Sequence, residues 1–487
     1  MTKTFLCLLV TAVAALAKDS PPNFIVINID DLGYADIQPF GSELNRTPNL
    51  NRMAQEGMKL TCFYAAPVCT PSRSALMTGC YPKRVMPIAS VLFPAGKLGL
   101  NPEEQTVAEV LKGAGYATAC VGKWHLGDQP EFLPTRQGFD FYFGIPYSND
   151  MGPLADGSKS NLGDPLPQPK SVAGKGVDPK TFGGDETGLK GAAQPPLPLL
   201  RNEKVIARVR AHEQTELVAR YTDEAVGFIR ENKAKPFFIY LPHSAVHFPL
   251  YPGKAFQKKS RNGYYGDWVE EVDWSVGRVL DTLRELGLAE KTLVIFTSDN
   301  GGTARGVNAP LRGGKGSTWE GGMRVPTIAW WPGKVPAGAT CDAITGMIDV
   351  LPTFAKLAGA KLPVKKIDGV DAWPLLSGQA KQGGRDLFYF YRGLKLEAVR
   401  QGSWKLHLAK GELYNLESDI GEATNVAKEN AEVVAQLQAL AAKTSEDLGP
   451  EGIGPGVRQP GRVENAQPLI GLDGKVREGF ADGASSL

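Results

Sequence analysis

Three continuous apolar runs stand out along the chain. They cover Phe24–Ile29, Pro236–Leu241 and Leu293–Thr297, and each is rich in β-branched and aromatic residues. Runs of this length and composition predict strands that are buried on both faces, as in a parallel sheet. Helical periodicity occurs between them, over Thr47–Glu56, Thr106–Gly113, Glu216–Glu231 and Asp267–Leu286. Strands that alternate with helices predict an α/β fold with the layers of an α/β/α sandwich.

The pattern changes beyond about residue 365. Short strand-like segments joined by turns containing Gly predict a small antiparallel sheet, over Leu387–Tyr391, Leu396–Arg400, Ser403–Leu408 and Glu412–Leu416. A helix is expected over Glu429–Leu448. Residues 151–200 are rich in Gly and Pro without periodicity, which predicts a long functional surface loop or a locally disordered segment. We expect a catalytic α/β domain over 18–365, an α+β subdomain over 366–448 and a Gly/Pro-rich tail over 449–487.

The first 17 residues have the features of a secretory signal peptide. Lys3 precedes an apolar run from Phe5 to Leu16, and Ala15-Leu16-Ala17 resembles a cleavage site. The run is shorter than a membrane span. The sequence therefore predicts an exported protein, periplasmic or secreted, without stable membrane association.

Composition and charge exclude some classes of function. The 487 residues include 54 Lys and Arg against 52 Asp and Glu, a formal net charge of +2. Such a balance does not favour a nucleic-acid partner. Because 42% of the residues are hydrophobic, the chain can bury a large core, and global disorder is excluded.

Polar residues follow each of the three predicted strands. Asp30 and Asp31 follow the first, His247 lies just beyond the second, and Asp299 and Asn300 follow the third. In open α/β sheets, ligands bind beyond the carboxyl ends of the strands. Each close pair of carboxylates costs roughly 4 kcal/mol at an effective dielectric constant near 20. A cation must offset that cost.

The oxygen-only ligand set favours Ca²⁺, or less strongly Mg²⁺, over zinc. Two alternatives need no metal. Arg73 and Lys123 could neutralise the acidic residues, or the aspartates could cap turns.

The most specific motif is Cys69-Thr70-Pro71-Ser72-Arg73, which continues to Thr78-Gly79. The chain here resembles the sulfatase family, which is defined by a C-x-P-S-R motif. Further blocks match that family in the same order, at 122–127, 298–302 and 314–322. The segment 144–148 and the spacing of the blocks are most similar to the branch of arylsulfatase A and N-acetylgalactosamine-6-sulfatase.

The resemblance implies an alkaline-phosphatase-like fold and a sulfuric ester hydrolase acting on aryl or carbohydrate sulfates. In this family the cysteine is oxidised to formylglycine by a formylglycine-generating or sulfatase-maturating enzyme, so that enzyme is an expected partner. One hydroxyl of the hydrated formylglycine attacks sulfur, and its second hydroxyl then expels sulfate. The implied metal ligands are Asp30, Asp31, Cys69, Asp299 and Asn300. The implied catalytic residues are Cys69, Arg73, Lys123, His125, His247 and Lys315. Ser148, Lys123, His247 and Lys315 are the implied substrate-binding residues.

Within this scheme His125 is the base for the second hydroxyl, and Lys315 or His247 protonates the leaving alcohol. Asp299 is a candidate base for the attack. Lys123 and His125, two residues apart, are expected on one side of an extended segment. His212 and His407 are expected to be ordinary packed or surface residues.

Two other functions stay open. A phosphonate or phosphate ester hydrolase of the same superfamily would share the fold, although the chain has few histidines at strand ends for a two-zinc site. A glycan-binding protein without activity would result if Cys69 were not converted. The pairing of Cys62, Cys80, Cys120 and Cys341 is not determined by the sequence.

Overall fold

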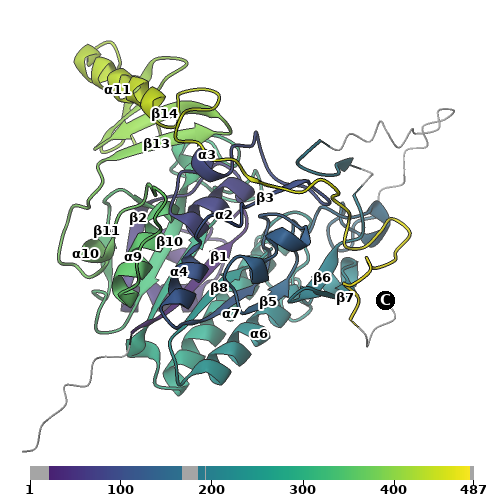
Figure 1. Ribbon diagram of the computed structural model, residues 1–487. Coiled ribbons are helices and arrows are strands. Elements are labelled where there is room, and N and C mark those ends of the chain that lie inside the picture. Colours follow the sequence, from purple (N-terminus) through teal and green to yellow (C-terminus); the bar gives the residue numbers. More distant parts are fainter. Residues whose placement is uncertain (1–20, 167–184, 192–193, 483–487) are drawn as a thin grey trace, which may run out of the picture.

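The computed structural model describes residues 21–166, 185–191 and 194–482. Within them, an eleven-stranded mixed sheet forms the centre of the α/β layers (Figure 1). Its strand order is β11-β2-β10-β9-β1-β8-β4-β5-β6-β7, with β12 also paired to β2. The predicted signal peptide lies outside the described residues.

The central strands are the three that the apolar runs predict. β1 (Asn23–Ile29) pairs in parallel with β9 (Thr292–Ser298) on one side and with β8 (Phe237–Pro242) on the other. Side chains of β1 alternate between two cores, with Phe24 and Val26 in one and Ile25 and Ile27 in the other. Both faces of the strand are therefore buried, which explains its continuous apolar sequence.

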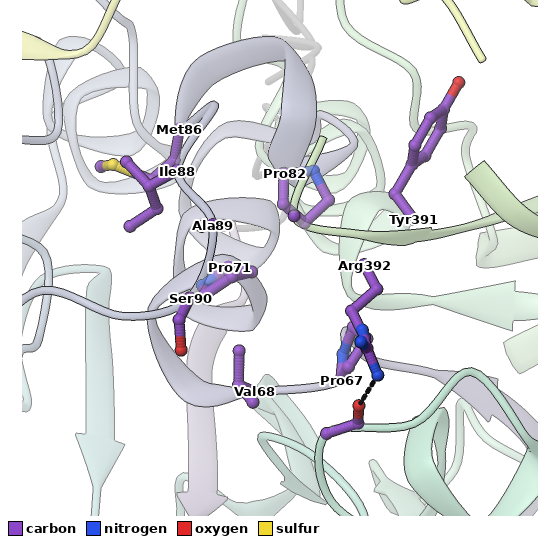
Figure 2. A pocket seen from close by; sticks show the side chains of 12 residues that line it. Pro67, Val68, Pro71, Pro82, Met86, Ile88, Ala89, Ser90, Tyr391 and Arg392 are labelled. Carbon is purple, nitrogen blue, oxygen red and sulfur yellow. Dashed lines mark hydrogen bonds between the residues drawn. The ribbon is translucent and has the colours of Figure 1, made fainter. Parts of the chain in front are cut away.

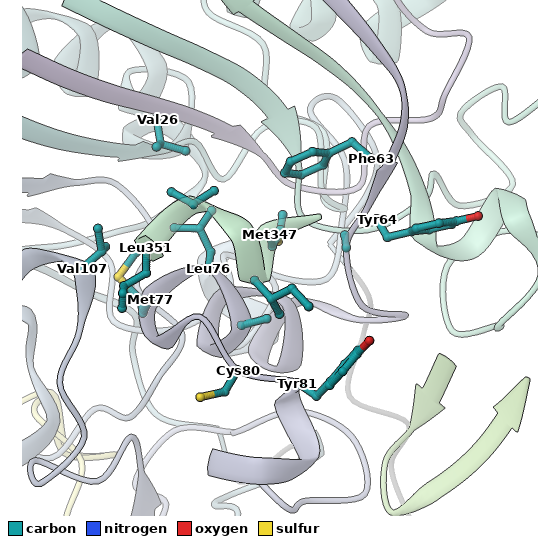
Figure 3. Packing of buried hydrophobic residues seen from close by; sticks show 14 of the residues in the cluster. Val26, Phe63, Tyr64, Leu76, Met77, Cys80, Tyr81, Val107, Met347 and Leu351 are labelled. Atoms are coloured by element: carbon teal, nitrogen blue, oxygen red, sulfur yellow. The ribbon is translucent and has the colours of Figure 1, made fainter. Parts of the chain in front are cut away.

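Helices cover both faces of this sheet. On one side lie α2 (Cys69–Thr78), α4 (Val107–Gly113) and α9 (Val350–Ala358), whose side chains pack with Val26 (Figure 3). On the other side lie α1 (Pro48–Glu56), α6 (Leu217–Asn232) and α7 (Gly263–Glu285). α7 begins four residues before the predicted Asp267. The α/β/α sandwich expected from the sequence is confirmed.

The other strands extend the sheet in both directions. Parallel strands β4 (Ala117–Val121) and β5 (Phe141–Gly144) follow β8. Antiparallel β10 (Arg324–Trp330) links β9 to β2 (Met58–Tyr64), and β11 (Ala339–Cys341) and β12 (Thr345–Gly346) pair with β2.

The sequence pattern missed a hairpin at the far edge of the sheet. β6 (Pro198–Arg201) and β7 (Lys204–Arg208) form this hairpin, so the segment predicted as a loop over 151–200 ends inside a strand. Pro195, Pro196 and Pro198 hide the strand signal, and Pro198 is tolerated because it is the first residue of β6.

A separate antiparallel sheet follows, as the sequence predicted (Figure 1). Its strands are β13 (Leu387–Arg392), β14 (Lys395–Gln401), β15 (Trp404–His407) and β16 (Glu412–Asn415). α11 (Ala431–Lys443) is shorter than predicted because its last turn continues as a 3₁₀ turn over Thr444–Glu446.

Short elements complete the described chain. The helices are α3 (Pro82–Val85), α5 (Ala211–Gln214), α8 (Glu320–Met323) and α10 (Trp373–Leu376). The tail crosses back over the catalytic domain, where β17 (Gly461–Arg462) pairs with β3 (Leu98–Gly99) and Ala481 bridges to Val205 in β7 (Figure 1).

The cysteines of the described chain are all unpaired and buried. The pairing that the sequence left open is therefore absent for Cys62, Cys80, Cys120 and Cys341, while Cys7 lies outside the described residues. A core of this size does not need a disulfide for stability. In addition, no helix among the described residues combines the length and apolarity needed to cross a membrane.

Candidate active site

The carboxyl ends of β1 and β9 bring the predicted acidic residues together. Asp30 and Asp31 directly follow β1. Asp299 and Asn300 directly follow its parallel neighbour β9, and all four side chains are buried. The backbone N–H of Asp31 donates to Oδ1 of Asp299 at 3.3 Å, and Nδ2 of Asn300 donates to Oδ1 of Asp31 at 2.7 Å. Parallel pairing of two strands thus builds one acidic cluster.

Two oxygens of this cluster are buried without a hydrogen-bond partner among the described residues. They are Oδ1 of Asp30 and Oδ1 of Asn300. Buried polar atoms are nearly always paired, so these two atoms indicate a missing ligand. Asp30, Cys69 and Asp299 also present potential ligand atoms within 4.8 Å of one another. Carboxylate and amide oxygens suit a hard divalent cation, so the residues present fit one.

Three cationic side chains contact the same carboxylates. The contacts are Arg73 with Asp299, Lys123 with Asp30, and Lys315 with Asp31. Arg73 uses both Nε and Nη2 on Oδ2 of Asp299, at 3.1 and 2.8 Å. The neutralisation that the sequence offered as an alternative to a metal is therefore present. It leaves the two unpaired oxygens unexplained, so charge compensation and a cation site are compatible here.

The two aspartates nearest Arg73 have different proton affinities. Burial alone would raise the pKa of Asp30, but Lys123 and the other cations outweigh it and hold that pKa well below its usual range. Burial, together with the charge of Asp30, raises the pKa of Asp299 to about 6. Asp299 is therefore the carboxyl of the pair that takes up a proton more readily, as a general base near neutral pH must.

Cys69 is the first residue of α2 and lies buried within this cluster. The positive end of the helix dipole favours negative charge on an atom placed there. Burial nevertheless raises the pKa of the Cys69 thiol. An unmodified Cys69 is thus a neutral thiol and a weak nucleophile.

His125 lies on the loop after β4, close to the start of α2. The backbone φ of His125 is 64°, a left-handed value. The loop is therefore not an extended segment, and the alternation expected to put His125 and Lys123 on one side does not apply to it. Nε2 lies 2.9 Å from the carbonyl oxygen of Leu92. Burial and the charge of Lys123 hold the pKa of His125 well below its usual range. The ring is therefore neutral, with its proton on Nε2, and Nδ1 has no partner among the described residues.

His247 reaches the site from the loop after β8. Its Nε2 lies 3.7 Å from Oδ2 of Asp31, and its Nδ1 lies 3.3 Å from Oγ of Ser148. Asp150, which the sequence did not single out, has Oδ1 4.0 Å from the same Nδ1. Its position two residues after Ser148 was the available signal. His243, at the start of the same loop, is instead buried in the core, where its Nε2 lies 3.1 Å from a serine hydroxyl of α7.

The predicted site residues therefore lie together at the carboxyl edge of the central strands. Each is in contact with, or electrostatically coupled to, another member of the set: Asp30, Asp31, Cys69, Arg73, Lys123, His125, Ser148, His247, Asp299, Asn300 and Lys315.

A cavity of about 270 Å³ adjoins the segments that carry Cys69 and Lys315 (Figure 2). Val68 precedes Cys69 and Gly316 follows Lys315, and both line it. The other residues that line the cavity include Met86, Ile88, Ala89 and Ser90, together with Tyr391 and Arg392 at the end of β13. The guanidinium of Arg392 donates to the carbonyl of Gly316 at 3.4 Å (Figure 2). The C-terminal sheet thus borders the active-site segments.

Comparisons with known proteins agree with this geometry. The profile of the sulfatase family matches residues 22–360, and that of the C-terminal part of N-sulphoglucosamine sulphohydrolase matches residues 314–447. Arylsulfatase A from Homo sapiens is 41% identical over 416 residues, which are 82% of this chain and 77% of that protein. N-acetylgalactosamine-6-sulfatase from Sus scrofa is 38% identical over 421 residues, 82% of this chain and 74% of that protein.

A solved structure is similar over most of the chain. The crystal structure of Ps i-CgsB in complex with k-i-k-neocarrahexaose has a TM-score of 0.70 and 31% sequence identity, and the match covers 87% of this chain and 92% of that one.

An oxygen-rich centre lined by cations, at this edge of an α/β/α sheet, suits an enzyme that acts on anionic esters. The family profile and the relatives specify which one. The chain belongs to the sulfatase family and is a sulfuric ester hydrolase.

Proposed function

We propose that the chain hydrolyses sulfate monoesters of aryl or carbohydrate alcohols through a formylglycine made from Cys69, with Ca²⁺ bound beside it. The observation that carries this proposal is the position of Cys69. Cys69 is the first residue of α2 and is buried. Its sulfur lies within 4.8 Å of a carboxylate oxygen of Asp30 and of Asp299. Because its thiol pKa is raised, Cys69 itself is unsuited to attack sulfur.

Formylglycine and the cation would supply the nucleophile and its activation. Hydrated formylglycine would offer one hydroxyl for attack and a second for release of sulfate, and a bound cation would lower the pKa of such hydroxyls. The side chains that would hold Ca²⁺ are Asp30, Asp31, Asp299 and Asn300. The unpaired oxygens of Asp30 and Asn300 support this assignment.

The cationic residues bind the ester and compensate charge. Lys123 and Lys315 carry ammonium groups that suit the oxygens of a sulfate, and the hydroxyl of Ser148 can donate a further hydrogen bond. Arg73 keeps Asp299 in place through its two contacts. These groups are fixed before the reaction, so they stabilise charge on the leaving oxygen without reorganisation.

Two histidines are placed to move protons in opposite directions. Nδ1 of His125 is an unprotonated acceptor because Nε2 donates to Leu92, so it accepts the proton of the second hydroxyl. His247 or Lys315 donates a proton to the departing alcohol. Both contact Asp31, which supports a position next to the reacting atoms.

Conversion of Cys69 and its necessity are tested together. We expect Cys69→Ala to abolish sulfate release while thermal unfolding stays near that of the parent. Cys341→Ala, at another buried cysteine remote from the motif, is the matched control and should retain turnover. Mass spectrometry of the peptide containing position 69 should show an aldehyde in place of the thiol. Near-parental turnover by Cys69→Ala would refute the mechanism.

The same measurements address the two alternatives. Parallel assays on nitrophenyl sulfate and nitrophenyl phosphate distinguish a sulfatase from a phosphate or phosphonate ester hydrolase. A thiol at position 69 in the protein from its native host would instead favour glycan binding without catalysis.

The substrate class and location complete the proposal. Relatives named for N-acetylgalactosamine-6-sulfate and a structure with a bound neocarrahexaose support a sulfated saccharide, and arylsulfatase A supports aryl sulfates as well. The alcohol is proposed to lie in the cavity beside Val68 and Gly316, which is next to the segments that carry Cys69 and Lys315 although neither of these residues lines it. The signal peptide over residues 1–17 would export the protein to the periplasm or outside the cell, after or during conversion of Cys69 by its maturation enzyme.

A further inference from the structure

Lys405, in β15 of the C-terminal sheet, has its ammonium group buried between two carboxylates. Nζ donates to Oε1 of Glu320 and to the carbonyl of Thr318, both at 2.8 Å, and lies 3.0 Å from Oε1 of Glu422. An ammonium has three donors, and these acceptors satisfy all of them. The side chains of Lys405, Glu320 and Glu422 have no exposed surface.

Glu320 holds a second set of contacts on the catalytic domain. Its Oε2 accepts from the hydroxyl of Tyr64 at 2.7 Å and lies 3.3 Å from Nη1 of Arg324. Burial alone would raise the pKa of Glu320, but the charges of Lys405, Arg324 and Arg400 lower it to about 2. Ion pairs buried in this way rarely add stability over apolar packing, which favours a role in fixing geometry.

The contacts of Lys405 act on the segment that carries Lys315. Thr318 and Glu320 lie three and five residues after Lys315 in the chain. Between them, Trp319 packs its ring 3.9 Å from that of His407 in β15, measured between centroids. The C-terminal sheet therefore contacts three consecutive residues, Thr318 to Glu320, of the segment that also carries Lys315.

The same contacts also reach the proposed ligands of the cation by another route. Glu320 begins α8, and the carbonyl of Gly322 in α8 accepts from the backbone N–H of Gly301 at 3.0 Å. Gly301 directly follows Asn300. Displacement of α8 would thus move the end of β9 as well as the Lys315 loop.

Glu422, which follows the C-terminal sheet in the chain, contacts both Glu320 and the sheet. Its Oε2 accepts from the backbone N–H of Glu320 at 2.7 Å, and its Oε1 lies 2.8 Å from Nε2 of His407. Its backbone φ is 50°, a left-handed value that is uncommon for a residue with a side chain. Such a conformation persists only when its surroundings determine it, as these contacts do.

We propose that Lys405 and Glu422 are positioning residues, which hold the segment from Thr318 to Glu320 so that Lys315 is presented to the sulfate ester. The proposal rests on the function proposed above for Lys315. It assigns the C-terminal sheet a part in catalysis although none of its side chains belongs to the acidic cluster.

A double-mutant cycle tests whether Lys405 acts through Lys315. The enzyme is the full mature chain with position 69 converted, and kcat/KM for 4-nitrophenyl sulfate is measured well below the melting temperature. Supporting residues of this kind typically contribute 10- to 100-fold, so we expect Lys405→Met to lower kcat/KM by about that factor. In a Lys315→Ala background, the same change should cost less than about 3-fold, because residues in one network are not additive.

The controls separate positioning from stability. Lys443 is an exposed residue of α11, the helix that packs against the C-terminal sheet. Lys443→Met should leave kcat/KM unchanged. A lower melting temperature for Lys405→Met with parental kcat/KM would overturn the proposal, and so would additive losses in the cycle. Should Lys405→Met not fold, Glu422→Gln replaces it, with the same non-additivity expected. If Lys315→Ala alone retains full turnover, the role proposed for Lys315 fails, which is a distinct result from additivity.

Discussion

Arg73 and Asp299 form a fully buried ion pair at the end of β9, in which Nε and Nη2 share one carboxylate oxygen at 3.1 and 2.8 Å. Arg73 comes from α2, four residues after Cys69, so the pair joins the helix that carries the reacting residue to the strand that carries the proposed cation ligands. One of the contacts that hold the site together therefore links residues 226 positions apart in the chain.

Loss of this pair should be costly for both stability and activity. Removing one partner of a buried pair typically costs about 3–5 kcal/mol, so we expect Arg73→Ala to lower the free energy of unfolding by that amount. Denaturant titration measures it. Arg230→Ala, which breaks an exposed pair with Glu285, should cost only about 0–1 kcal/mol. Equal effects of the two substitutions would contradict the assigned importance of burial.

Removal of divalent cations should inactivate and destabilise the protein. A ligand that binds only the folded state stabilises it by about 4 kcal/mol at a thousand times its Kd. We expect treatment with EGTA to stop sulfate release and lower the melting temperature, and Ca²⁺ to restore both more fully than Mg²⁺. In Asp30→Asn, the melting temperature should no longer respond to Ca²⁺. An unchanged melting temperature after chelation of the parent would argue against the cation site.

A general acid matters most when the leaving alcohol is a poor one. General acid catalysis contributes about 10²- to 10⁴-fold, so His247→Ala should lower kcat/KM by that order for a sugar sulfate. For nitrophenyl sulfate, whose leaving group needs little protonation, the loss should stay within about tenfold. The same pair of substrates applied to Lys315→Ala shows which residue is the acid. Equal losses on both substrates would assign His247 to binding alone.

Glu271 of α7 should make stability fall at high pH. Its side chain is buried and accepts from the backbone N–H of Gly253 at 2.7 Å, and burial raises its pKa from 4.5 to about 8. The folded state therefore holds a proton that the unfolded chain releases. This contribution to stability is complete below pH 4.5 and is lost as the pH rises through about 8.

Melting temperatures between pH 5 and 9 test this sign. Glu271→Gln keeps the acceptor but removes the ionisation, so its melting temperature should fall less between pH 5 and 8 than that of the parent. Glu285→Gln, at an exposed position of the same helix, should behave like the parent. Parallel curves for Glu271→Gln and the parent would disprove the assignment.

Arg392 should influence affinity for polyanionic substrates. Its guanidinium borders the cavity, is 57% exposed and has Nε 3.3 Å from Oε1 of Glu397, so a second anionic group on a saccharide would compete with that carboxylate for the charge. We expect Arg392→Ala to raise KM about 3- to 10-fold for an oligosaccharide with several sulfates, or roughly 0.7–1.4 kcal/mol, and to leave nitrophenyl sulfate unaffected. Arg230→Ala, an exposed arginine of α6, is the control. An equal change on both substrates would place the effect outside the cavity.

Much of the fold could be predicted because its signals are local. The run at Phe24–Ile29 is apolar at every position except Asn28, so burial on both faces follows directly from the sequence. The motif that begins at Cys69 and the doublets at Asp30-Asp31 and Asp299-Asn300 are contiguous, so they too are visible in one dimension. The hairpin of β6 and β7 was missed because prolines at its start conceal the strand.

Tertiary structure alone decided which of these residues meet. Parallel pairing of β1 with both β8 and β9 brings the three strand ends to one edge, and it sends His247 to the site while His243, four residues earlier, enters the core. Lys405 and Glu320 are 85 residues apart in the chain, and no local pattern of charge predicts their contact. Sequence by itself determined the three central strands, the chemistry at their ends and the resemblance to the family. Packing determined the proton on Nε2 of His125, the unpaired oxygens of Asp30 and Asn300, and the support of the Lys315 loop, because each depends on neighbours that are distant in the chain.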